Sequence, residues 1–216
     1  MASLFDYDNP IISGINKVVD MILLSIIYGF LCIPIITIGP ATTALYYAVV
    51  KNIRRERSYP FREFFKSFKS NFKQGFLVNL IFIAVYLILY IDIQYAKTMA
   101  GTIGTVLSGI FVGLFILAIA INVYVFPYLS RFEVTIKQLL KNSFFLSVRH
   151  LPSTIAIMII LGVGLFIVWI LPLTLFLIPS IIFLLQSLLI ERIFKKYMPE
   201  KTDEATSQGV DQWYLE

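Results

Sequence analysis

The sequence predicts an all-α protein, a polytopic membrane helix bundle with about five transmembrane helices and amphipathic cytoplasmic interfacial helices. Three observations predict this fold class. The chain of 216 residues is 58% hydrophobic and 14% charged, whereas soluble domains are typically about 45–50% apolar and about 25% charged. The apolar residues form long runs, which favours a bilayer as the solvent. Most cations lie between these runs, as in polytopic membrane proteins.

Residues 1–190 are expected to form a single transmembrane domain. A helix needs about 20 residues to cross the hydrocarbon core, which predicts spans at about residues 15–37, 75–91, 103–128, 153–171 and 173–190. A single helix over 153–190 would overrun the bilayer, so a hairpin that turns at Pro172 is favoured. Pro179 is expected to kink the fifth helix. Asp6 and Asp8 stand where a signal peptide would carry cations, so the first span is expected to be a retained anchor.

A helix break is predicted after the first span, where Pro34, Gly39 and Pro40 follow one another closely. Pro40 suits the first turn of a new helix over about residues 40–57. Two interpretations are open for this segment. It is either a cytoplasmic elbow that leads into an interfacial helix, or a broken helix at membrane depth of the kind that transporters use to bind ligands. The elbow is favoured.

A second interfacial helix is predicted over about residues 60–74. At about 100° per residue, five aromatic residues share an arc of about 100°: Phe61, Phe64, Phe65, Phe68 and Phe72. An adjacent arc of about 60° carries the cations Arg62, Lys66, Lys69 and Lys73, and the remainder carries Glu63, Ser67, Ser70, Asn71 and Gln74. This pattern favours phenylalanines in the acyl boundary and cations on anionic headgroups. Two alternatives are packing against the bundle's own cytoplasmic face and insertion into a groove of a partner. Gly75 is expected to separate this helix from the second span.

The distribution of cations predicts the orientation in the membrane. Sixteen of the 18 Lys and Arg residues lie in the segments 51–73, 131–149 and 192–201. Five spans place these three segments on one side, so the N-terminus is expected outside and the C-terminus in the cytoplasm of a bacterial cell. The tail over residues 191–216 is expected to be cytoplasmic and disordered towards its end.

A few polar and small residues lie inside the predicted spans. Asn79, Asn122 and Gln186 are expected at similar depth, where hydrogen bonding between helices is favoured over a ligand-binding or permeation role. Gly109 and Gly113 form a small-xxx-small pair that is expected to allow close helix packing.

The sequence offers little catalytic chemistry. His150 is the single histidine and Cys32 the single cysteine, and the chain has no Gly-rich phosphate loop or nucleophile elbow. No catalytic, cofactor-binding or metal-binding residue is therefore expected, and an enzyme is not expected. The net charge of +5 does not indicate nucleic acid, because in a membrane protein the placement of cations matters more than their sum.

The string PIITIGPATTALYY, followed by a basic run and FREFFKSFKSNFKQ, resembles the YesL-type family of small bacterial integral membrane proteins. The function of that family is unknown. The resemblance covers about the first 90 residues and implies an association with carbohydrate-utilisation gene clusters, beside sugar transporters of the ATP-binding-cassette type and glycoside hydrolases. It implies no catalytic or ligand-binding residues.

Two classes of function follow from these expectations. The first is a non-enzymatic accessory protein that contacts anionic lipid and binds a membrane partner, with a sugar permease of the ATP-binding-cassette type as the candidate. The second is a small transporter or channel component that acts as an oligomer; the break at Pro34–Pro40 favours it, whereas the lack of an evident central ion pair in the spans disfavours it.

Overall fold

The computed structural model of the chain describes residues 10–54, 59–99 and 101–197, and within these ranges it is helical and contains no strand. The all-α fold class is confirmed. The helices, in chain order, are α1 (Pro10–Cys32), the 3₁₀ turn η1 (Ile35–Thr37), α2 (Ile38–Ala48), the π-helical turn η2 (Val49–Arg54), α3 (Pro60–Thr98), α4 (Thr102–Arg131), α5 (Ile136–Arg149), α6 (Leu151–Ile170), the 3₁₀ segment η3 (Pro172–Phe176) and α7 (Ile178–Phe194).

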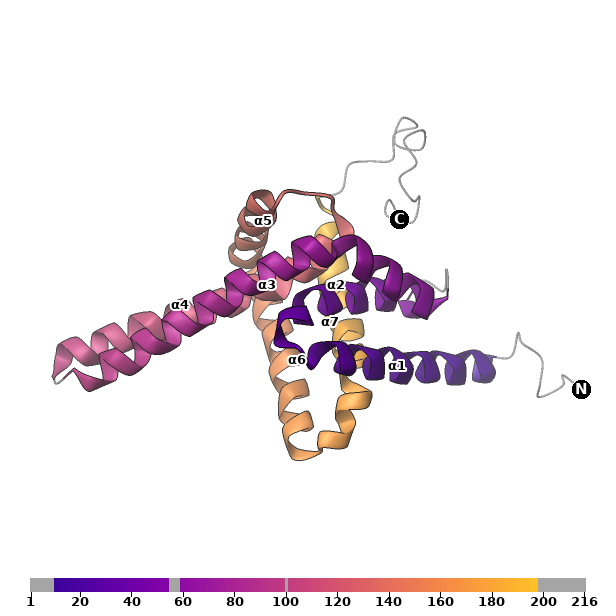
Figure 1. Ribbon diagram of the computed structural model, residues 1–216, viewed down its shortest axis with the longest axis horizontal. Helices are drawn as coiled ribbons and strands as arrows, with labels where there is room; N and C mark the ends of the chain where they lie inside the picture. The colour runs from indigo at the N-terminus through magenta and orange to yellow at the C-terminus, as the bar shows by residue number, and fades with distance from the viewer. Residues whose placement is uncertain (1–9, 55–58, 100, 198–216) are drawn as a thin grey trace, which may run out of the picture.

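The short helix α2 lies at the centre of the molecule. Every residue from Gly39 to Ala48 is buried, and α1, α3, α4 and α7 all pack against it. We call α2 and the helix segments packed against it the central cluster. Three apolar helical segments extend from this cluster in different directions (Figure 1): α1 to one side, the α3–α4 hairpin far to the opposite side, and the α6–α7 hairpin downwards. The fold is therefore a helical cluster around α2 with long apolar extensions.

The core consists of three neighbouring groups of apolar side chains. The first joins α2 to α4 and α7 through Tyr46, Tyr124 and Phe194. The second joins α2 to α1 and α3 through Leu45, Leu24 and Phe64. The third joins α3, α4 and α5 and contains Val78, Val125 and Leu139. Since α2 contributes to two of the three groups, it is the element around which the other helices are arranged.

The structure corrects the prediction of a surface helix over residues 40–57. The residues from Gly39 to Ile53 are all buried, and residues 55–58 lie outside the described ranges. The physical reason is the composition of α2, in which small residues let the neighbouring helices approach closely. A Cβ atom on Gly39 would overlap the carbonyl oxygen of Gly75 and lie 2.8 Å from Cβ of Asn79.

The structure also corrects the predicted separation of residues 60–74 from the second span. Both belong to α3, a continuous helix of 39 residues. Gly75 does not end a helix; a Cβ atom there would lie 3.0 Å from Cα of Pro40 on α2. A glycine in a helix interior costs about 0.5–1 kcal/mol relative to alanine, and here it allows the two helix backbones to cross in contact.

The C-terminal hairpin turns at η3, which begins at Pro172. Pro179 does not kink a helix, because it lies in the first turn of α7, where the missing N–H has no helical partner to lose. Four of the described helices are long and apolar enough to cross a membrane, namely residues Gly14–Cys32 of α1, and α3, α4 and α6. The predicted fifth span corresponds to α7, which has 17 residues and extends to Phe194. Of the predicted tail, the part beyond residue 197 lies outside the described ranges.

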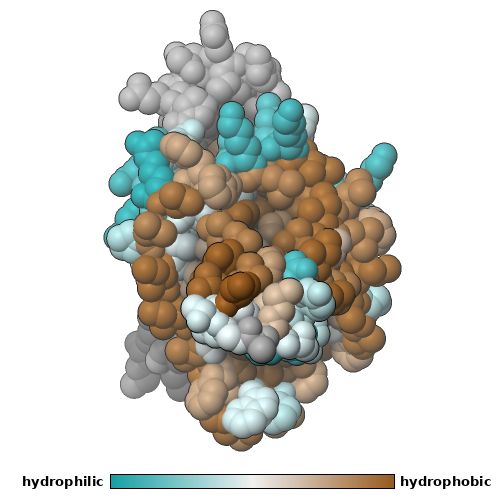
Figure 2. Space-filling model, turned by 90° about the vertical axis from the view of Figure 1, so that its left-hand side faces the viewer, coloured by the Kyte–Doolittle hydropathy of each residue, from teal (hydrophilic) through white to brown (hydrophobic). Residues whose placement is uncertain are grey.

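The outer part of the α3–α4 hairpin, residues 83–117, is named the arm here. Apart from position 100, which is not described, Ala96 and Gly104 at the turn are its buried residues. Its remaining side chains are exposed or half-buried, and most are apolar, among them Leu87, Ile91 and Ile110. Figure 2, which faces the tip of the arm, shows hydrophobic surface over most of this side and hydrophilic side chains along the upper edge. This distribution suits a helical hairpin in lipid.

Candidate functional site: two buried ion pairs around α2

Two adjacent tyrosines of α2 each contact a buried ion pair. Tyr46 and Tyr47 are successive residues and therefore point about 100° apart around the helix. The hydroxyl group of Tyr46 donates a hydrogen bond to Glu191 of α7 at 3.0 Å. The hydroxyl group of Tyr47 accepts one from Lys51 of η2 at 3.3 Å. The two tyrosines thus link α2 to two separate charged groups in the central cluster.

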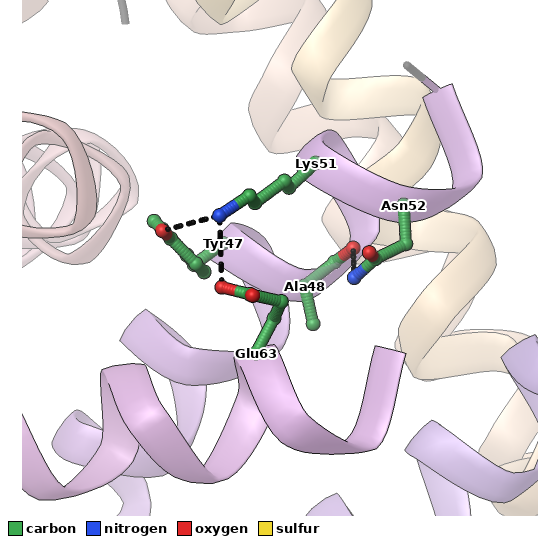
Figure 3. A network of polar contacts seen from close by, with 5 residues as sticks. All are labelled: Tyr47, Ala48, Lys51, Asn52 and Glu63. Atoms are coloured by element: carbon green, nitrogen blue, oxygen red, sulfur yellow. Dashed lines mark hydrogen bonds and ion pairs between the residues drawn. The ribbon is translucent and has the colours of Figure 1, made fainter. Parts of the chain in front are cut away.

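The first ion pair joins η2 to α3 (Figure 3). Lys51 Nζ lies 2.9 Å from Glu63 Oε2, and the two side chains are 10% and 8% exposed. The same ammonium group lies 5.3 Å from the centroid of the Tyr47 ring. Nearby, the Asn52 side chain donates to the carbonyl oxygen of Ala48 at 2.9 Å. The π-helical turn η2 is therefore held by an ion pair to α3 and by a side-chain hydrogen bond to the last residue of α2.

The second ion pair is more deeply buried and joins α4 to α7. Arg131 Nη2 lies 2.8 Å from Glu191 Oε2, and the two side chains are 0% and 2% exposed. Arg131 is the last residue of α4, a position where a cation also interacts favourably with the helix dipole. With Tyr46 on the other carboxylate oxygen, Glu191 connects α2, α4 and α7 through one side chain.

These ion pairs determine how the helices are placed relative to one another more than they raise the net stability of the protein. A buried ion pair contributes little compared with an apolar replacement, because desolvation offsets most of the attraction, but removing one partner costs about 3–5 kcal/mol. The arrangement therefore favours one relative placement of α2, α3, α4 and α7. In chemical terms, the two pairs place two carboxylates, two cations and two phenols in the interior.

The residues of the helix break lie where α1 gives way to α2. Pro34 precedes η1, and Pro40 lies in the first turn of α2. The Asn79 side chain donates a hydrogen bond from α3 to the carbonyl oxygen of Ile35 at 2.9 Å. Because a helix break leaves carbonyl groups without helical partners, Asn79 satisfies one of the groups released between Pro34 and Gly39.

The other two amides within the predicted spans have different surroundings. Asn122 of α4 is half-buried. Gln186 of α7 is 2% exposed, and its Nε2 atom has no hydrogen-bond partner in the part of the chain that the structure describes. Among the described residues, no hydrogen bond joins any two of Asn79, Asn122 and Gln186, so the structure does not bring them together as one bonded layer.

The phenylalanines of residues 60–74 are divided between the interior and the surface. Phe64 is fully buried against α1 and α2, whereas Phe65 and Phe72 are 42% and 40% exposed. Phe61 and Phe68 are half-buried. The predicted interfacial cations are all exposed, namely Arg62, Lys66, Lys69 and Lys73. The polar remainder of the helix is divided as well: Glu63 and Ser67 are buried, and the Gln74 side chain donates to the carbonyl oxygen of Val134, whereas Ser70 is exposed.

Metal-binding chemistry is not evident in the described ranges, which contain no group of three His, Cys, Asp or Glu side chains. Cys32 is a half-buried free thiol. His150 lies at the junction of α5 and α6, and its Nε2 atom is 3.0 Å from the hydroxyl group of Tyr197. Partial burial lowers the pKa of His150, and the neighbouring cations Lys196 and Arg149 lower it further.

The sequence did not predict the four charged residues of the two ion pairs as a site. Lys51 and Arg131 were expected among the cytoplasmic cations, and Glu63 in the polar remainder of an interfacial helix. One signal was present: Glu63 lies four residues before Ser67 on a common helix face. That face has no other charge, which is consistent with a core-facing side. For Glu191, no local pattern distinguishes the buried carboxylate from an exposed one at a helix end.

Comparison with known proteins finds a similarity to one family model. Residues 21–93 match the family model described as "Protein of unknown function, DUF624". The matched segment covers less than half of the chain; it includes α2 and the first ion pair, whereas Arg131 and Glu191 lie outside it. No curated protein matches the chain. No solved structure matches it either.

Proposed function

We propose that this chain is a non-enzymatic integral membrane protein that binds the membrane helices of another protein through its arm. The proposed partner is a sugar permease of the ATP-binding-cassette type. The proposed location is the bacterial plasma membrane, with the N-terminus outside and the C-terminus in the cytoplasm, as the cation distribution favours.

The exposure of the arm is the observation that supports this proposal. Gly109 and Gly113 lie one helical turn apart on α4, both are exposed, and a Cβ atom on either would meet nothing within 4 Å. The exposed β-branched residues Ile110 and Ile116 flank them. Small residues at this spacing let membrane helices approach closely, and α3 does not occupy that face. The pair predicted to allow close packing is therefore directed away from the chain's own helices.

The choice of a sugar permease rests on the resemblance to the YesL-type family and its gene clusters. The proposal that the chain is not an enzyme rests on the arrangement of its interior charges. Glu63 and Glu191 are each paired with a cation. The hydroxyl group of Tyr46 donates to Glu191, whereas that of Tyr47 accepts from Lys51, the partner of Glu63. A general acid or base needs access to a substrate proton. These carboxylates instead form ion pairs that join neighbouring helices.

Site-specific photocrosslinking in native membranes tests the proposal. A photoreactive residue at Ile110 or Ile116 of the arm is expected to capture a sugar permease subunit, identified by mass spectrometry, in cells grown on carbohydrate. Matched control positions are Ile159 and Val163, which are exposed apolar residues on α6. Replacing Gly109 and Gly113 by isoleucine should abolish the capture without affecting the fold, because both positions face open space. Capture of this chain alone, or equal capture from α6, would contradict the proposal.

A second candidate function is transport by the chain itself. The observation that favours it is the buried helix α2, which begins at a helix break and carries two charged pairs beside it. Buried charges and broken helices mark substrate paths in many transporters. Sugar uptake by the purified chain in proteoliposomes would support this second function. Absence of uptake, together with permease capture by the arm, would support the first.

A further inference from the structure

Helix α5 has one face against the protein and one face exposed. A capping box at Thr135 and Gln138 fixes its start. Leu139, Ser143 and Leu146 are buried, and α5 packs against α4 and α6. At about 100° per residue, these side chains share one side of the helix. The opposite side does not face the protein interior.

The exposed side of α5 combines apolar side chains with cations. Phe144, Phe145 and Val148 are between 45% and 53% exposed, and Lys137 and Lys141 are exposed on the same arc. No acidic residue occurs within Ile136–Arg149. An exposed face that mixes aromatic residues with lysines, and contains no carboxylate, is typical of a helix that lies in the plane of an anionic membrane surface.

Arg149 contributes differently from the two lysines. Its guanidinium carbon lies 5.5 Å from the centroid of the Phe145 ring and 5.8 Å from that of Tyr197. The arginine therefore orients Phe145 and connects α5 to the turn that follows α7. Lys137 and Lys141 lie one helical turn apart, so both ammonium groups can reach headgroups on the same side of the helix.

The position of α5 in the fold agrees with a membrane boundary. The hydrogen bond from Gln74 to Val134 places the basic stretch of α3 beside the start of α5, and Lys66, Lys69 and Lys73 of that stretch are exposed. In Figure 1, α5 lies on the upper side of the molecule, and Figure 2 shows hydrophilic side chains along the upper edge above a largely hydrophobic surface. Cations at the edge of an apolar surface are expected where acyl chains give way to headgroups.

We propose that α5 is an anionic-lipid contact site. Phe144, Phe145 and Val148 enter the acyl boundary, and Lys137 and Lys141 bind the phosphate groups of anionic phospholipids. This surface is separate from the phenylalanines of residues 60–74, of which Phe64 packs inside the protein. It is also separate from the arm, whose proposed partner is a protein.

Lipid competition around a single fluorophore tests this site in the full chain. Cys32→Ser removes the native thiol, and Val148→Cys provides the attachment point on α5. The labelled chain is reconstituted in phosphatidylcholine vesicles and in equimolar phosphatidylcholine and phosphatidylglycerol, with either lipid brominated. Quenching then gives the preference of α5 for the anionic lipid over the neutral one. Each lysine near an anionic surface should contribute about fivefold to this preference, and the preference should weaken as salt rises.

Variants separate the contribution of the lysines from that of total charge. Lys137→Gln with Lys141→Gln should reduce the preference to about one. Lys97→Gln with Arg192→Gln removes the same charge at exposed positions outside α5 and should leave the preference unchanged. Equal quenching by both lipids in the unmodified chain would overturn the proposal. A label that bromolipid does not quench would also overturn the proposal. Quenching by aqueous iodide would then show that the label faces water, and its absence would show that the label contacts protein.

Discussion

The two halves of the α3–α4 hairpin differ in which side chains they bury and which they expose. In the central cluster, α3 and α4 bury charged and polar side chains, among them Glu63, Asn79 and Arg131. In the arm, the same helices expose Leu87, Ile91 and other apolar side chains, while small residues lie at the turn between them. A helix in lipid gains little by hiding apolar side chains from lipid. The arm therefore depends on close packing alone, whereas charge pairs and close backbone crossings define the cluster.

This difference predicts where substitutions matter. Changes in the cluster should affect the folded state strongly, because they leave a buried charge unpaired, open a cavity or push two backbones apart. Changes on the exposed side of the arm should leave the fold intact and affect only what binds there.

The largest effect is expected from unpairing the charge at the end of α4. Glu191→Gln retains the size of the side chain but removes the anion beside Arg131, which should destabilise the protein by about 3–5 kcal/mol. Thermal unfolding in detergent measures the loss. Combining Glu191→Leu with Arg131→Met should recover most of it, because an apolar pair needs no counter-charge. A double variant that is as unstable as the sum of its single changes would show that the ion pair does not couple α4 to α7.

The neighbouring phenylalanines of α3 provide a matched comparison of inside and outside. Phe64→Ala should cost about 3–5 kcal/mol, because Phe64 is fully buried. Phe65→Ala should cost much less, because Phe65 is 42% exposed. Unfolding of both variants under identical detergent conditions measures the difference. Equal losses would place both rings in the interior and remove the basis for an exposed phenylalanine face on this helix.

A smaller effect is expected where α2 crosses α3. The added methyl group of Gly39→Ala would overlap the carbonyl oxygen of Gly75, so the backbones must separate at a cost of about 1–3 kcal/mol. Gly113→Ala on the arm is the control, since a Cβ atom there meets nothing within 4 Å, and the added methyl group should slightly favour the helix. Melting temperatures should fall for the first variant and stay constant or rise for the second. A fall in both would mean that the arm is packed against something within the folded chain.

The sequence predicted those parts of the fold that depend on local patterns. Apolar runs predicted the helices, and Pro34, Gly39 and Pro40 marked the junction of α1 and α2, because proline and glycine act on the backbone where they stand. The burial of α2 depends on contact between Gly39 and Gly75, which are far apart in the chain. No periodicity within either segment reports such a pairing.

The candidate site was missed for a related reason. Counting cations between apolar runs predicts which side of a membrane a loop occupies, but it treats all cations alike. Lys51 and Arg131 differ from the exposed lysines only through their partners Glu63 and Glu191. Those partners come from helices that no local pattern placed nearby. Interior charge pairs therefore become visible only once the helices are assembled.

The smallest effect is expected at His150, outside the cluster and the arm. Burial, followed by the nearby Lys196 and Arg149, lowers the pKa of His150 below its ordinary value of 6.5. The folded protein thus binds a proton on this side chain less readily than the unfolded chain. The contribution of His150 to stability is therefore fully present above the unfolded pKa. It falls as pH drops below about 6.5 and levels off below the folded pKa.

His150→Gln should flatten this part of the stability profile, and thermal unfolding between about pH 7.5 and pH 5 should show a slightly smaller fall than in the unmodified chain. Tyr197→Phe is the matched control. It removes the hydroxyl group 3.0 Å from His150 Nε2 but retains the cations that oppose protonation, so most of the pH dependence should remain. A profile that steepens in His150→Gln would mean that the imidazolium is stabilised in the folded protein, contrary to the effect expected from Lys196 and Arg149.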